Sequence, residues 1–134
     1  MVRELLVNET LTDAMINSGA QLIKQLDAQE AEVKSAFWFY FSDEHVWKLM
    51  LASPKVSSEG PKKFYKRIIE ANKNIEESVW KVSLNNMGLL TLEDNLVQLL
   101  GEVFKTDNSI NAIRFSKSAI NGHFIDDLHI YRMQ

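Results

Sequence analysis

The residues whose types could do chemistry gather near the end of the chain, in His123-Phe-Ile-Asp126-Asp127-Leu-His129. Carboxylates and imidazoles are the usual ligands of divalent metals and the usual acid–base groups. On a strand, residues two apart share a face, so Asp127 and His129 point the same way as His123, while Asp126 points the opposite way. Groups in line along one strand do not enclose a metal. We therefore predict no metal site. The alternative function is that of a small metal-assisted hydrolase whose catalytic residues are Asp127 and His129.

A second polar cluster, Asp43-Glu44-His45, falls between two apolar segments and is predicted to form the tip of a hairpin. Exposed loop tips are usually polar, so this cluster needs no catalytic explanation. The 5 glycines are scattered and form no phosphate-binding loop, and none of the 3 histidines has an identifiable nucleophile partner. The motifs therefore predict no cofactor and favour a protein that is not an enzyme.

Composition limits the class of protein. The 134 residues fit one domain over residues 1–134, and the net charge of −3 argues against nucleic acid as the partner. The absence of cysteine excludes disulfides and thiolate zinc sites and fits a reducing compartment. The longest apolar run, Ala36–Phe41, is far shorter than the roughly 20 residues that cross a bilayer, and Glu4 and Asn8 interrupt any signal-peptide core. We predict a cytoplasmic protein without a membrane segment.

The elements that position these groups are organised around one aromatic hairpin. Its strands are predicted over Val33–Phe41 and Val46–Ala52, because aromatic and β-branched residues favour strands. The loop length decides which side chains share a face. With Asp43-Glu44-His45 as the loop, the phenylalanines of the first strand join Trp47 and Leu49. With Asp43-Glu44 alone as the loop, the first strand instead contributes its polar-tipped rings, Trp38 and Tyr40, to the face of Trp47 and Leu49.

We favour the first of these registers, because it separates purely apolar rings from rings with polar tips. In either register both faces of the first strand are aromatic, and such a strand is usually covered on both sides. Trp47 and Leu49 are predicted to be core residues.

The remaining elements follow from apolar spacing and turn residues. The stripe Leu11–Leu26 predicts a helix capped by Asn8 or Thr10, in which Gly19 either weakens the helix or allows close approach to a neighbour. The elements after the hairpin are a loop at Lys55–Glu59, a helix over Pro61–Ile75, a short strand favoured over a helix at Ser78–Leu84, a turn at Asn85–Gly88, a helix over Thr91–Phe104, a loop at Lys105–Ser109, and a second hairpin of Ile110–Lys117 and Phe124–Met133 turning at Asn121-Gly122. The order α-β-β-α-β-α-β-β predicts an α+β domain with a mainly antiparallel sheet of four to five strands and helices packed on one face.

If both hairpins share one sheet, its second face carries rings with polar tips, methionines and cations, which are typical of interfaces. A second core layer roofed by a helix explains the same residues equally well. We predict a non-enzymatic interaction or regulatory module whose partner is another protein or a second copy in a symmetric dimer. The predicted interface residues are Trp38, Tyr40, Lys48, Arg114, His129 and Tyr131.

Overall fold

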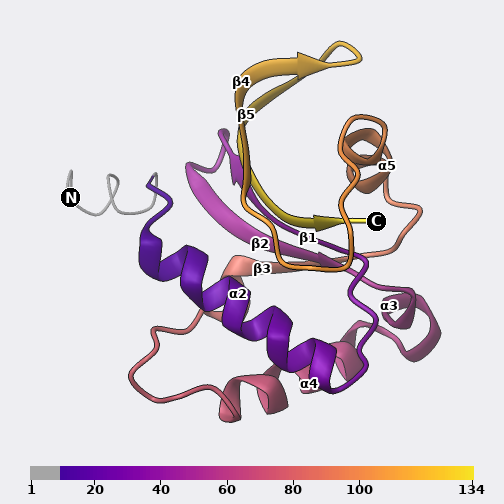
Figure 1. The fold of residues 1–134 in the computed structure, drawn as a ribbon. Coiled ribbons are helices and arrows are strands. Elements are labelled where there is room, and N and C mark those ends of the chain that lie inside the picture. Colours follow the sequence, from indigo (N-terminus) through magenta and orange to yellow (C-terminus); the bar gives the residue numbers. More distant parts are fainter. Residues whose placement is uncertain (1–9) are drawn as a thin grey trace.

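The computed structural model describes residues 10–134 and contains one five-stranded sheet with the strand order β3-β2-β1-β5-β4 (Figure 1). All neighbouring strands are antiparallel except β2 and β3, which are parallel. The α+β class, the mainly antiparallel sheet and the predicted order of elements are confirmed. The elements are α2 (Asp13–Ala28), β1 (Ser35–Phe41), β2 (Val46–Ala52), α3 (Pro54–Glu59), α4 (Pro61–Lys73), a 3-10 turn (Leu84–Asn86), β3 (Met87–Leu90), α5 (Asn95–Gly101), β4 (Ile113–Ile120) and β5 (His123–Met133).

Apolar residues cover the sheet on both sides. On one side, which we call the α2 face, helices α2, α3 and α4 bury Trp38, Leu49 and Tyr131. On the other side, the α5 face, the short helix α5 places Leu100 against Phe37 and the middle of β5. Figure 1 shows β4 and β5 curling so that α5 lies within the curve of the sheet. The longer helices thus share one face, and α5 supplies limited cover for the other. Among residues 10–134, none of the helices combines the length and apolar character needed to cross a bilayer.

The favoured register of the first hairpin is wrong. Phe41 pairs with Val46 and Trp38 pairs with Leu49, so Trp38 and Tyr40 share the α2 face with Trp47. The phenylalanines of β1 therefore lie on the α5 face, as in the second register considered. The loop Ser42–His45 is closed by hydrogen bonds from the Glu44 and His45 amides to carbonyls at the end of β1 and the start of the loop. Trp47 and Leu49 are buried as predicted, because they face α2 and α4 in this register.

A bulge in β5 changes which residues face α2. The pairing of β1 with β5 shifts between Ala36 and Phe37, so that both Tyr131 and Arg132 point toward α2. The alternation assumed from sequence is lost at this point, since a bulge inserts one extra residue into one strand. Met133 consequently lies on the α5 face, where its sulfur accepts a hydrogen bond of 3.3 Å from the Ser35 hydroxyl.

Two other segments differ from the sequence prediction. Residues 55–59, predicted as a loop, form most of α3, because Ser53 caps that helix by accepting a hydrogen bond of 3.1 Å from the Lys55 amide and Pro54 opens it. The strand favoured at residues 78–84 is absent, and β3 forms instead over Met87–Leu90, which begins within the turn predicted at Asn85–Gly88. Its position depends on parallel pairing with β2, which no local pattern reveals. The cap of α2 is Thr12 rather than Thr10, and Asn8 and the interrupted core at residues 4–8 lie outside the described residues.

Gly19 lets α2 approach the sheet. A Cβ at this position would meet the ring of Tyr131, with the ring carbon Cζ 2.8 Å away. We expect Gly19→Ala to lower the free energy of unfolding by about 2 kcal/mol, because the overpacking outweighs the gain of about 1 kcal/mol in helix propensity. Gly101→Ala in α5 is the matched control, since a Cβ there has nothing within 4 Å, and its change is expected to stay within about 0.5 kcal/mol of zero. Urea titration measures both, and equal effects would contradict the close approach.

Candidate functional site

Three of the predicted interface residues are buried within the chain. Trp38 and Tyr131 lie beneath α2, and His129 lies on the same face of the sheet with its ring 5.0 Å from that of Tyr131. The Tyr131 hydroxyl donates to the Ile16 carbonyl at 2.6 Å and accepts from Trp38 Nε1 at 2.9 Å. Burial raises the pKa of the Tyr131 hydroxyl, while the bond from Trp38 opposes that change. Trp38 and Tyr131 satisfy their polar tips within the chain, whereas the buried Nε2 of His129 has no hydrogen-bond partner among the described residues. All three side chains are buried, so they offer no surface to a partner while α2 is in place.

The other three predicted interface residues are dispersed. Lys48 lies on the α5 face, 5.5 Å from the centre of the Phe41 ring. Arg114 lies on the α2 face near the sheet edge, with its guanidinium carbon 5.3 Å from the Trp47 ring. Tyr40 packs its half-buried ring 5.4 Å from that of Trp47. The six residues therefore do not form one continuous surface.

The alternative catalytic pair, Asp127 and His129, shares the α2 face, but Asp127 is held by neighbouring side chains and His129 is buried, with its ring 5.0 Å from that of Tyr131. Arg114 donates two hydrogen bonds of 2.6 Å to the Asp127 carboxylate, and Ser116 donates one of 2.7 Å. Burial raises the pKa of Asp127, but the hydrogen bonds from Arg114 and Ser116 outweigh it, so the net pKa lies below the usual range. Burial lowers the pKa of His129, and the charge of Arg114 lowers it further. Within residues 10–134, no group of three or more ligand-type side chains is placed to hold a metal.

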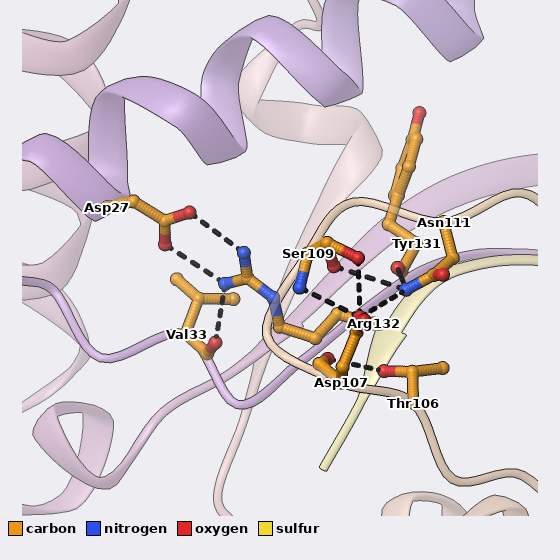
Figure 2. Close-up of polar contacts among 8 residues, drawn as sticks. All are labelled: Asp27, Val33, Thr106, Asp107, Ser109, Asn111, Tyr131 and Arg132. Atoms are coloured by element: carbon orange, nitrogen blue, oxygen red, sulfur yellow. Dashed lines mark hydrogen bonds and ion pairs between the residues drawn. The ribbon is translucent and has the colours of Figure 1, made fainter.

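An ion pair that the sequence analysis did not find joins the buried Arg132 of β5 to the partly exposed Asp27 of α2 (Figure 2). Arg132 reaches the Asp27 carboxylate with hydrogen bonds of 3.0 and 2.8 Å and also donates to the Val33 carbonyl at 2.9 Å. Figure 2 also shows Asn111 donating to the Tyr131 carbonyl, at 3.2 Å, which ties the loop before β4 to β5. These contacts fix the bulged end of β5. Their role is structural, because the carboxylate of Asp27, both terminal nitrogens of Arg132 and the Asn111 amide bond to groups of the same chain, although Arg132 Nε has no hydrogen-bond partner among the described residues.

A hollow on the α5 face is bounded by α5 and the β4–β5 hairpin. Residues 123–127 of β5 pair only with β4, so this part of the hairpin projects beyond β1 as a two-stranded arm. A groove of about 560 Å³ separates the arm from α5. Its apolar lining consists of Phe39, Leu96, Leu99, Phe124 and Ile125. The groove is open because α5 has 7 residues and covers only part of the face.

A shallower hollow of about 170 Å³ continues this groove toward the tip of the first hairpin. The two hollows share Phe39 and Phe124, and the second adds Phe41 together with the polar residues of the loop. We call the combined surface the phenylalanine groove. The apolar side chains that define it are Phe39, Phe41, Leu96, Leu99, Phe124 and Ile125.

The sequence analysis missed this site because it assigned the phenylalanines of β1 to the inner core. The alternative register turns them away from Trp47 and Leu49 and toward the face of the partly exposed Lys48, and that was the available signal. The polar cluster Asp43-Glu44-His45 does lie at a hairpin tip as predicted, and Asp43 and Glu44 line the shallower hollow.

Of the described helices, three cover one face of the sheet and the short helix α5 covers part of the other. The chain is therefore a single-sheet α+β protein whose open site is an apolar groove. Comparisons with family models, with curated proteins and with solved structures found no match.

Proposed function

We propose that the protein is a non-enzymatic interaction module that binds a segment of another protein in the phenylalanine groove. The supporting observation is Phe124, which is 66% exposed and stands in the wall of a concave apolar surface. Single exposed hydrophobic side chains are ordinary, but contiguous apolar surface bounded by polar residues is typical of binding grooves. The module would act through an aromatic sheet face, namely the face of phenylalanines. The absence of cysteine fits a reducing compartment, and we place the module in the cytoplasm.

A second copy of the chain is the other occupant that the sequence suggests. A symmetric dimer presses the same patch of both copies together. At this groove, that contact would gather Asp43, Glu44 and Asp126 of both copies into one interface. Like charges across an interface oppose association, so we propose a different protein as the partner. Light scattering at micromolar concentration is expected to give a monomer. If the protein is instead a dimer that the Phe124→Glu substitution dissociates, the occupant of the groove is a second copy of the chain and not a different protein.

Selection from a displayed library of random 16-residue peptides tests the groove. Peptides enriched on the unmodified protein should bind the Phe124→Glu variant at least about 30-fold more weakly, because a charge then enters the apolar wall. Trp80→Glu is the matched control, since Trp80 is 49% exposed and lies outside the groove lining. Its affinity should stay within about twofold of the unmodified protein. A library that yields no peptides, or peptides indifferent to Phe124→Glu, would overturn the proposed function.

A further inference from the structure

The charged side chains that line the two hollows of the phenylalanine groove are all carboxylates, while the Lys48 ammonium stands over the ring of Phe41, 5.5 Å from its centre. Asp43, Glu44 and Asp126 line the shallower hollow, and Glu102 lines the deeper one. Within the described part of the chain, no lysine or arginine lines either hollow. Lys48 forms an ion pair with one of these carboxylates, its ammonium lying 3.7 Å from the carboxylate of Glu44. The apolar floor is therefore bounded by carboxylates on more than one side.

These carboxylates are poorly neutralised by the chain itself. Asp43 and Asp126 have no ion-pair partner among residues 10–134, and the side chains of Glu44 and Lys48 are both exposed enough for solvent to weaken their attraction. Glu102 accepts a hydrogen bond from the neutral Asn121 amide. An acidic rim beside an apolar floor raises the local concentration of cations and repels anions.

We infer that the partner segment is a cationic amphipathic peptide, which places apolar side chains in the groove and lysine or arginine at its rim. This inference rests on the proposed function and adds the chemistry of the partner. The same rim repels anionic partners, including an anionic lipid surface, nucleic acid and acidic peptides. Because the rim is open to solvent, the attraction weakens as salt shortens the screening length, which is about 8 Å at physiological ionic strength.

The composition of the selected 16-residue peptides provides the first test. Peptides that depend on Phe124 should be enriched in lysine and arginine over aspartate and glutamate relative to the unselected library. Peptides that depend on Phe124 but show no such enrichment would overturn the inference and leave the proposed function standing. An absence of any peptide that depends on Phe124 would overturn both. The two failures are thus distinguishable in one data set.

Charge reversal at the rim provides the second test. The double variant Asp43→Lys with Asp126→Lys should weaken binding of the selected peptides roughly tenfold at low ionic strength, and the difference should shrink as salt is added. Glu76→Lys with Glu77→Lys is the matched control, because it makes the same change in net charge on exposed residues outside the groove lining. The control should weaken binding less than about twofold. Equal losses in both variants would show that net charge acts instead of the rim, and would overturn the inference.

Discussion

Replacement of Trp38 by alanine is expected to lower the free energy of unfolding by about 4–5 kcal/mol, at the upper end of the range for a buried tryptophan. Trp38 is fully buried on the α2 face, so its removal leaves a large cavity between β1 and α2. It also removes the indole N–H that bonds the Tyr131 hydroxyl at 2.9 Å. Because domains are typically stable by only about 5–15 kcal/mol, the variant should be close to unfolding at 25 °C. Urea titration at constant slope measures the change.

Two companion variants separate the causes of this loss. Trp38→Phe keeps an aromatic ring but loses the N–H, and it should cost about 1–2 kcal/mol, since the Tyr131 hydroxyl retains its bond to the Ile16 carbonyl. Trp80→Ala removes a half-exposed tryptophan from the segment before the 3-10 turn and should change stability by less than about 1 kcal/mol. A loss below about 1 kcal/mol for Trp38→Ala would mean that α2 does not cover this face.

Replacement of Asp27 by alanine is expected to lower the free energy of unfolding by about 3 kcal/mol. The change leaves the Arg132 guanidinium, whose side chain is 2% exposed, with only the Val33 carbonyl as its hydrogen-bond acceptor among the described residues. Breaking a buried ion pair costs about 3–5 kcal/mol, and we take the lower end because the Asp27 side chain is 41% exposed. Thermal unfolding or urea titration of the single variant measures the loss.

A double-mutant cycle tests whether the loss of stability comes from the buried Arg132 guanidinium that no longer has a carboxylate partner. Arg132→Met removes the guanidinium while keeping an apolar stem, so Asp27→Ala combined with Arg132→Met should recover most of the loss seen with Asp27→Ala alone. Glu70→Ala breaks an exposed pair with Lys73 and should change stability by less than about 1 kcal/mol. If Arg132→Met recovers nothing, the loss comes from the end of α2 and not from the orphaned cation.

The sequence alone determined the type and order of most elements. The apolar stripe of α2, the strand Val46–Ala52 and the Asn121-Gly122 turn are confirmed, and both turn residues have the positive φ that this dipeptide tolerates. These features depend on neighbours a few residues apart in the chain. Spacing of apolar residues and turn chemistry are local properties, so they can be identified without knowing the fold.

The tertiary structure decided which face of the sheet each aromatic residue occupies, and it thereby decided where the phenylalanine groove lies. A shift of one residue in register exchanges every side chain between the two faces, and the sequence analysis chose the wrong register by treating polar-tipped rings as the more exposed ones. The polar tips of Trp38 and Tyr131 are instead bonded to each other beneath α2, across 93 positions of the chain. The bulge that turns Arg132 toward Asp27 and the parallel pairing that positions β3 are equally non-local. The phenylalanines were left on the face that, among the described helices, only the short α5 covers, and the groove exists because that cover ends before the projecting arm of β4 and β5.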